Sequence, residues 1–242
     1  MSCQIKVDKT AEKVPQTEGR LKQKADQVYE LIRRSIIMLE MEPGAPILER
    51  SICSQLAVSR TPLREAVQRL AEEGLVKVIP HSGTYVSRIS FEVAEEGFII
   101  RRALEIESVR RASLRYSYAA GAELDEILAG MQRVLDTGQL DRYLDEDDKL
   151  HSTIARMSGM PRIWKFITMA KVHLDRMRQL SAPVPGHLAI VTEQHAAIVA
   201  AIRSGKPDQA ELAMRIHLES SFEVMTRVYH QRTNMFASKE TE

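Results

Sequence analysis

The order of secondary-structure signals in the first ninety residues is the feature that most constrains the fold. Apolar residues recur at helical spacing over 21–40, which predicts a first helix. The pattern also predicts two shorter helices, 49–56 and 59–73. Two β-rich runs, 75–80 and 84–88, then flank a turn that contains Gly83. Three helices followed by a hairpin are typical of a winged helix-turn-helix, which we predict for residues 20–88.

The pattern changes at residue 90. Strand signals are absent beyond it, and helical periodicity interrupted at Gly, Pro and Ser predicts an all-α bundle. Six helices are expected: 91–118, 122–136, 140–157, 161–180, 187–204 and 207–232. We therefore predict a mainly α protein, with a helical domain over 91–235. Residues 1–19 are polar and without periodicity, so we expect a flexible arm there.

Composition narrows the class of protein. No run of eighteen apolar residues suggests a membrane span, and the N-terminus lacks the apolar stretch of a secretory signal. Two cysteines, Cys3 and Cys53, do not make a disulfide framework, so we expect a cytoplasmic protein. The net charge is only +1, but residues 20–90 hold 11 Lys and Arg against 8 Asp and Glu. This modest excess suits phosphate contacts, although ordinary fluctuation explains it equally well.

The stretch from Ala57 to Ala66 is the most informative part of the N-terminal region. Ser59 is placed as a helix N-cap, where its hydroxyl would accept a hydrogen bond from a free backbone N–H. Pro62 falls in the first turn, where its missing N–H has no cost. The residues expected to be buried follow at helical spacing: Leu63, Ala66, Val67 and Leu70.

Polar side chains are left on the outer face of this helix near its N-terminus, namely Arg60, Thr61 and Arg64. A recognition helix presents that end to base edges in the major groove of double-stranded DNA. Arg50 opens the preceding helix and is placed to contact a phosphate. The hairpin tip, from His81 to Gly83, is placed to lie along a minor groove. One such arginine alone is better explained as a solvated surface residue, but the combination with a wing favours DNA binding.

The same residues carry a resemblance to a known family. The stretch 58–66, followed by the spacings at 72–76 and 80–86, resembles the signature of the GntR family of bacterial regulators. The resemblance implies that the operator is contacted by four residues: Arg50, Arg60, Arg64 and Gly83. Two departures are Ala57, where glycine is frequent and some strain is expected, and Ile52-Cys53, where Leu-Ala is usual.

The helical region contains a second constellation. Asp147 and His151 are four residues apart on a predicted helix, so both project from one face. His195 and His217 follow on two later helices. One carboxylate and three imidazoles suit Zn²⁺, Ni²⁺ or Mn²⁺. The spacing alone leaves open that these are ordinary surface or capping residues.

The segments around these four residues are similar to the FCD-type effector domain of the FadR branch of that family. The resemblance implies a divalent metal held by all four side chains. It also implies that Arg101 faces the cavity, where an arginine beside a metal would suit a small organic acid. An intramolecular ion pair of Arg101 is the alternative, and Arg176 and Arg178 are weaker ligand candidates. Six helices indicate the shorter, VanR-like subgroup.

Three functions compete at this point. The favoured one is a homodimeric regulator, usually a repressor, which releases or rebinds a pseudo-palindromic operator when a small organic acid binds beside the metal. A second is a DNA-binding protein whose helical domain is purely structural or dimerising. A metal-dependent hydrolase is disfavoured, because no general base is placed beside the ligands in an H-E-x-x-H or equivalent motif. We therefore predict that the chain is not an enzyme.

Overall fold

The computed structural model describes residues 18–139 and 142–237, which fall into two compact units. The first unit combines Met1–Ser90 with Thr233–Glu242, and the second is Phe91–Arg232. Of the arm expected over 1–19, residues 1–17 lie outside the described residues. Among the described residues, no helix combines the length and the apolar character that a membrane span requires.

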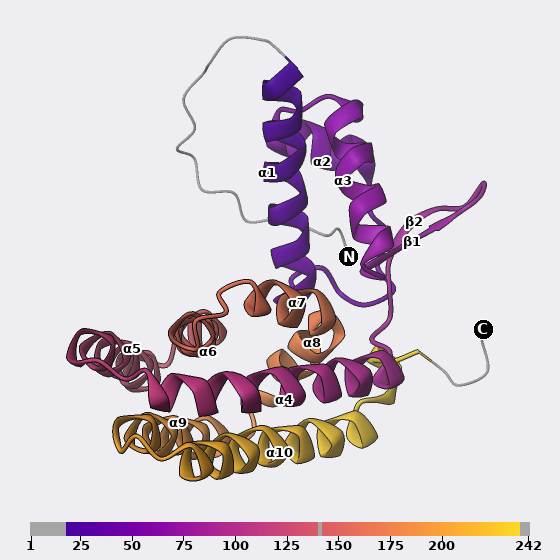
Figure 1. Ribbon diagram of the computed structural model, residues 1–242. Coiled ribbons are helices and arrows are strands. Elements are labelled where there is room, and N and C mark those ends of the chain that lie inside the picture. Colours follow the sequence, from indigo (N-terminus) through magenta and orange to yellow (C-terminus); the bar gives the residue numbers. More distant parts are fainter. Residues whose placement is uncertain (1–17, 140–141, 238–242) are drawn as a thin grey trace. The chain divides into compact units, whose positions relative to one another are not determined.

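The first unit is a winged helix-turn-helix, as predicted (Figure 1). Its elements are α1 Glu18–Ile37, α2 Glu49–Leu56, α3 Arg60–Glu72, β1 Val76–Ile79 and β2 Gly83–Val86. Helix α1 packs along α3, and the four residues of α3 expected to be inside are buried. The strands pair antiparallel with Val76 opposite Val86 and Ile79 opposite Gly83. Gly83 has φ +132°, a backbone conformation that glycine adopts without strain.

The turn between α2 and α3 confirms one expectation and corrects another. Ala57 ends α2 in the left-handed conformation, with φ +51° and ψ +43°, where the family usually places glycine. Ser59 does occupy the N-cap position of α3 in an extended conformation. Its hydroxyl, however, makes no capping hydrogen bond, so the prediction of that bond is wrong. The extended backbone at the N-cap therefore fixes the start of the helix without help from the side chain.

The first unit also contains a segment from the far end of the chain. The N–H of Ile89 donates to the carbonyl of Met235 at 3.1 Å, and the N–H of Ala237 donates to the carbonyl of Ile89 at 2.9 Å. Phe236 is buried beside this parallel bridge. The second unit ends at Arg232, whereas the sequence predicts a helical domain up to residue 235, and the segment that follows pairs with Ile89, which lies after β2.

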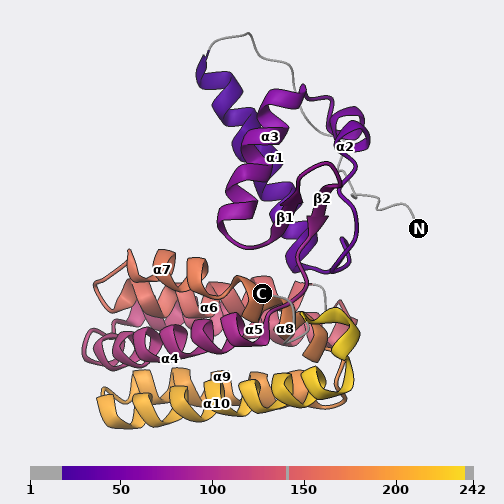
Figure 2. The same cartoon turned by 90° about the vertical axis from the view of Figure 1, so that its right-hand side faces the viewer.

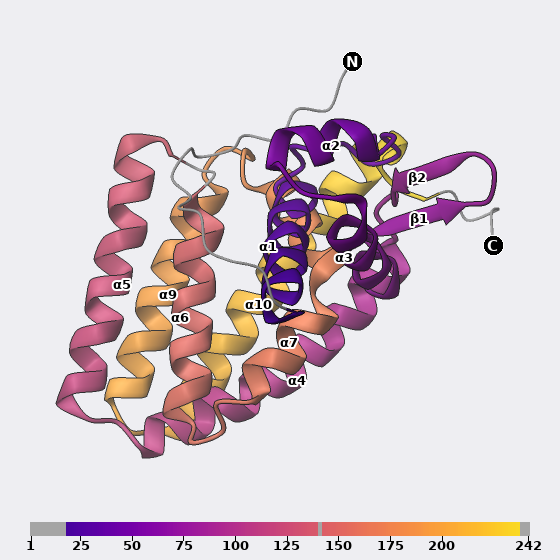
Figure 3. The same cartoon turned by 90° about the horizontal axis from the view of Figure 1, so that it is seen from above.

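The second unit is all helical, but it has seven α-helices within the described residues and not six. They are α4 Phe91–Leu114, α5 Tyr118–Thr137, α6 Tyr143–Met157, α7 Ile163–Ala170, α8 Val172–Ser181, α9 His187–Arg203 and α10 Pro207–Gln231. Helices α4 and α10 lie side by side along much of their length (Figure 2). Phe91 stacks on Tyr229, and Phe98 stacks on Phe222, so the two helices run antiparallel. Helix α5 lies beside α6 and α9 (Figure 3).

The extra helix arises because the segment expected as one helix, 161–180, is broken at Lys171. No Gly or Pro marks this break, so local signals predict a continuous helix. The Lys171 ammonium turns inward instead, 2.7 Å from Asp175 and 3.0 Å from Asp148. Gly97 of α4 packs against the same joint, where a Cβ would collide with the carbonyl oxygen of Ala170. The count of six helices, which indicated the VanR-like subgroup, is therefore wrong and no longer supports that assignment.

Replacing Ala57 with glycine should stabilise the first unit. An alanine in the left-handed conformation raises the free energy of the folded state by about 1–2 kcal/mol, and glycine removes this strain. Part of the benefit is lost because glycine has a larger conformational entropy in the unfolded chain. We expect Ala57→Gly to increase the free energy of unfolding by about 0.5–1 kcal/mol in urea titrations. Ala71→Gly, which lies within α3, is the matched control and should lower it by about 1 kcal/mol. A loss of stability in Ala57→Gly would contradict the strained turn.

Candidate functional site

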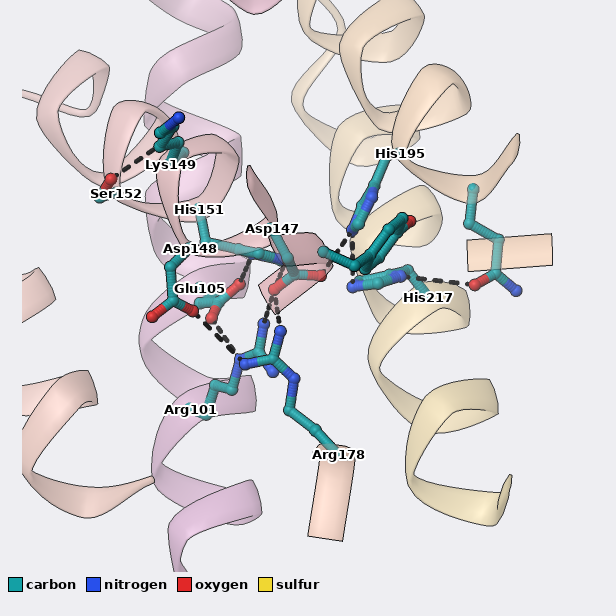
Figure 4. A network of polar contacts seen from close by, with 12 residues as sticks. Arg101, Glu105, Asp147, Asp148, Lys149, His151, Ser152, Arg178, His195 and His217 are labelled. Atoms are coloured by element: carbon teal, nitrogen blue, oxygen red, sulfur yellow. Dashed lines mark hydrogen bonds and ion pairs between the residues drawn. The ribbon is translucent and has the colours of Figure 1, made fainter. Parts of the chain in front are cut away.

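Four polar side chains meet inside the helical unit, although they come from three helices (Figure 4). Asp147 and His151 are on α6, His195 is on α9 and His217 is on α10. Each of these residues is at most 3 % exposed. One potential metal-ligand atom from each lies within 4.8 Å of the others. The structure thus brings together all four residues that the sequence singled out as metal ligands.

The distances within this cluster fit the coordination shell of a divalent ion. His195 Nε2 lies 3.3 Å from His217 Nε2 and 3.4 Å from Asp147 Oδ1. His151 Nε2 is 3.7 Å from Asp147 Oδ2, and it is buried without a hydrogen-bond partner among the described residues. Ligand atoms about 2.1 Å from a tetrahedral metal are separated by about 3.4 Å. The cluster is therefore already near the size that such an ion requires.

The protonation states also suit a cation. Burial is the main reason why the pKa of His195 falls to about 3 and that of His217 falls well below its ordinary value. Both imidazoles are consequently neutral at pH 7, with lone pairs available. Burial alone would raise the pKa of Asp147, but the charge of Arg178 holds it well below its usual range. A carboxylate with neutral imidazoles is a ligand set for Zn²⁺, Ni²⁺ or Mn²⁺.

A second layer of polar residues supports the cluster. His151 Nδ1 is in close contact with Glu105 Oε2, which leaves Nε2 facing Asp147. Arg101 Nε donates to Glu105 Oε1 at 2.6 Å, and Arg101 Nη2 is 3.8 Å from Asp147. The structure therefore shows Arg101 in an intramolecular ion pair, the alternative left open by the sequence. Glu105 connects the arginine of α4 to a candidate metal ligand of α6.

Arg178 is more closely engaged with the cluster than the sequence suggested. Its Nη2 contacts Asp147 Oδ2, and its Nη1 donates to Asp175 Oδ1 at 2.8 Å. Asp148 lies 3.4 Å from the same Nη1. Arg176, the other weak candidate, is fully buried in α8 and does not line the cavity beside the cluster.

That cavity lies on the Asp147 and His217 side of the cluster, with Arg101 and Arg178 in its wall. His187 and Met225 also line it. Its volume is about 20 Å³. A single water molecule needs roughly 10–15 Å³ by the same measure, so the cavity in this conformation has no room for an organic acid.

The residues predicted to contact DNA lie at the surface of the first unit. Exposed side chains at the start of α3 are Arg60, Thr61 and Arg64, and Ser59 precedes them. The Arg64 side chain is 69 % exposed, and its Nε is as far as 4.0 Å from the Glu49 carboxylate. Its guanidinium is therefore available to a ligand. Arg50 on α2 is exposed, as is the hairpin tip from His81 to Gly83. A helix and a wing that are both exposed match the way in which winged helix-turn-helix proteins bind DNA.

Comparison with known proteins agrees with this architecture. The description of bacterial regulatory proteins of the gntR family matches residues 24–86, and that of the FCD domain matches residues 96–220. The second match alone covers more than half of the chain. The chain belongs to the GntR family of DNA-binding transcription regulators, with an FCD domain. The matched families consist of regulators and not enzymes, which confirms the prediction on catalysis.

Individual relatives span nearly the whole chain. An HTH-type transcriptional regulator in an unstable DNA locus of Streptomyces ambofaciens is 33 % identical over 92 % of this chain and 93 % of its own length. The HTH-type transcriptional repressor RspR of Escherichia coli is 29 % identical over 88 % and 93 %. The solved structure of E. coli McbR/YncC has the same fold, with a TM-score of 0.76 at 22 % identity over 85 % of this chain and 98 % of its own.

Sequence reasoning missed part of the second layer. The spacing of Glu105 does not relate it to His151, which lies on a different helix, so the sequence does not single it out. Opposite charges at helical spacing on α8, Asp175 and Arg178, were the available signal for a buried ion pair. The contact of Arg178 with Asp147 depends on the break at Lys171, for which there is no local signal.

Removing the charge of Glu105 should be strongly destabilising. Glu105→Gln leaves the Arg101 guanidinium buried without its carboxylate, and breaking such a pair costs about 3–5 kcal/mol of unfolding free energy. Glu107→Gln is the matched control, because Glu107 pairs with Arg111 on the surface of the same helix. The control should lose less than about 0.5 kcal/mol. Equal, small losses in urea titrations of the two variants would contradict a structural ion pair at Glu105.

The pair of Arg101 and Glu105 should also make the free energy of unfolding depend on pH. Burial alone would raise the pKa of Glu105, but Arg101 and His151 lower it to about 2. The contribution of Glu105 is therefore fully present above about pH 4.5 and is lost as the pH falls towards 2.

Proposed function

We propose that this regulator is a homodimeric repressor that binds a divalent metal and a small organic acid in its helical unit and changes its operator affinity in response. The observation that carries the proposal is the buried cluster of Asp147, His151, His195 and His217, with Arg101 and Arg178 in the wall of the adjoining cavity. A bound ion would supply positive charge and open coordination positions for a carboxylate. The arginines are suited to hold the rest of that anion.

A purely structural or dimerising helical domain explains the cluster less well. Burying charged side chains is expensive, and well-packed apolar residues of similar volume are often as stable or more stable. Three further carboxylates lie around the cluster, those of Glu105, Asp148 and Asp175, together with two arginines and a lysine. Such a concentration in a core is typical of a binding site.

The DNA-binding part of the proposal rests on the first unit. Arg60 and Arg64 are the best candidates for base contacts, and Arg50, Ser59 and Thr61 are suited to contact phosphates. The wing residues His81 and Gly83 would approach the adjacent groove. Because one recognition helix reads few base pairs, two copies on a pseudo-palindrome are expected. Relatives that are themselves repressors, RspR and a probable D-xylose utilization operon repressor of Paenarthrobacter nicotinovorans, support the direction of control.

Chain connectivity provides a route from the cluster to the DNA-binding unit. Helix α4 carries Arg101 and Glu105, and it follows directly after Ser90 of the first unit. Helix α10 carries His217, and it is followed by residues 233–237, which pair with Ile89. A ligand that shifts α4 against α10 would therefore pull on the first unit at both of its covalent connections. The coupling is limited by the difference in affinity of the ligand for the two states, typically about 1–3 kcal/mol.

The DNA contacts can be tested by alanine substitution. Replacing Arg60 or Arg64 should cost about 1–3 kcal/mol of binding free energy on the cognate operator and less on random DNA. Fluorescence anisotropy at fixed salt measures both. Arg203→Ala, which removes an exposed arginine of α9, is the control and should leave both affinities unchanged. Negligible losses on both DNAs in the two test variants would remove Arg60 and Arg64 from the interface.

The metal site can be tested by elemental analysis. Protein purified without chelator should hold one divalent ion per chain, and His195→Ala should lose it and melt at a lower temperature, since metal binding adds to folding free energy. The control is His230→Ala, which removes an exposed histidine and should retain the ion. If the wild-type protein holds no metal, and added Zn²⁺, Ni²⁺ or Mn²⁺ leaves its melting temperature unchanged, the metal proposal is wrong.

A further inference from the structure

We propose that Arg178 is an internal cation that competes with the metal for Asp147, and that metal binding releases its guanidinium to take the carboxylate of the effector. This inference rests on the proposed metal site and assigns a specific role to Arg178. It predicts that the cavity accepts an anion only after the metal is bound. The chemical class of effector that follows is a small monoanionic carboxylate.

Arg178 contacts Asp147 at a carboxylate oxygen that would bind the metal. Arg178 Nη2 contacts Asp147 Oδ2, the oxygen that faces His151 Nε2 at 3.7 Å. The other oxygen, Oδ1, faces His195 Nε2 at 3.4 Å. A cation at the centre of the cluster would take up the negative charge that now holds Arg178. Two cations at one buried carboxylate repel each other, so the ion weakens the arginine contact.

Arg178 can leave Asp147 without leaving the site. Its Nη1 donates to Asp175 Oδ1 at 2.8 Å and lies 3.4 Å from Asp148 Oδ1, so one arm of the guanidinium stays anchored. The nitrogen that would leave is Nη2, which contacts Asp147 (Figure 4). Arg178 also lines the cavity beside the cluster. A guanidinium held in this way presents planar donors that match a carboxylate.

The charges of the connected ionic cluster change sign when the metal binds. Counted without the imidazoles, four carboxylates outnumber three cations by one. A divalent ion turns this net charge of −1 into +1, so the same cavity first repels and then attracts a monoanion. The charged members, joined by ion pairs, are Arg101, Lys171, Arg178, Glu105, Asp147, Asp148 and Asp175.

The size of the cavity also supports a movement of Arg178. At about 20 Å³ it has room for about one water molecule, so a carboxylate can enter only if a wall residue moves. The long side chain of Arg178 is a wall residue with a reason to move when the metal arrives. One displacement therefore opens the space and frees the donor. By linkage, metal and carboxylate should each tighten the binding of the other by the same factor.

The decisive experiment is a Zn²⁺ titration against a competing chelator with the full-length chain. Arg178→Gln removes the competing cation and should bind Zn²⁺ about tenfold more tightly than the wild-type protein. Arg178→Lys keeps the charge but cannot bridge two carboxylates, so it should also bind more tightly, by a smaller factor. This variant keeps the test open if Arg178→Gln fails to fold. Arg156→Gln is the matched control, because Arg156 of α6 forms an exposed pair with Glu123 of α5, and it should bind like the wild-type protein.

A second arm uses acetate as the anion and acetamide as its neutral analogue. Wild-type protein should bind acetate with Zn²⁺ and not with EDTA, acetamide should bind in neither state, and Zn²⁺-loaded Arg178→Gln should bind acetate more weakly. Equal or weaker Zn²⁺ binding by the folded Arg178 variants would overturn the competition while leaving the metal site intact. Acetate binding of equal strength with EDTA would overturn the charge reversal. Failure of the wild-type protein to bind Zn²⁺ would instead overturn the proposed function itself.

Discussion

The burial of the Asp147 carboxylate is the constraint on which the helical unit depends. A carboxylate 3 % exposed in a protein core must be neutralised by charge and hydrogen bonds, or it would take up a proton. Here the neutralising charges come from Arg101 of α4 and Arg178 of α8. The imidazoles of His195 on α9 and His217 on α10 each bring a ring nitrogen within 4.8 Å of the same carboxylate. These helices are thus fixed relative to α6 by electrostatics as well as by apolar packing.

This constraint also bears on the proposed response to a ligand. Arg178 contacts three carboxylates, those of Asp147, Asp148 and Asp175, so it can lose one of them and still be paired. The helices that supply the cluster include α4 and α10, which are adjacent and antiparallel and which both continue into the DNA-binding unit. A change in pairing around Asp147 therefore acts on the two helices whose ends lead to the wing strand and to Ile89.

Much of this organisation could be predicted from the sequence because it follows from local patterns. The spacing around Pro62 predicts helix α3, and four-residue spacing places Asp147 and His151 on one face. What could not be predicted depends on contacts between distant segments. The break at Lys171 follows from an ammonium that turns towards Asp148 and Asp175 and from the close approach of Gly97. The pairing of Ile89 with the C-terminal segment likewise has no local signal.

Anomalous diffraction at the zinc absorption edge tests the central claim most directly. Crystals of the wild-type protein grown with Zn²⁺ and without chelator would supply the data. The account predicts one anomalous peak per chain inside the helical unit, within coordination distance, about 2.0–2.2 Å, of Asp147, His151, His195 and His217. Anomalous peaks confined to the protein surface, with no peak among these four side chains, would contradict it.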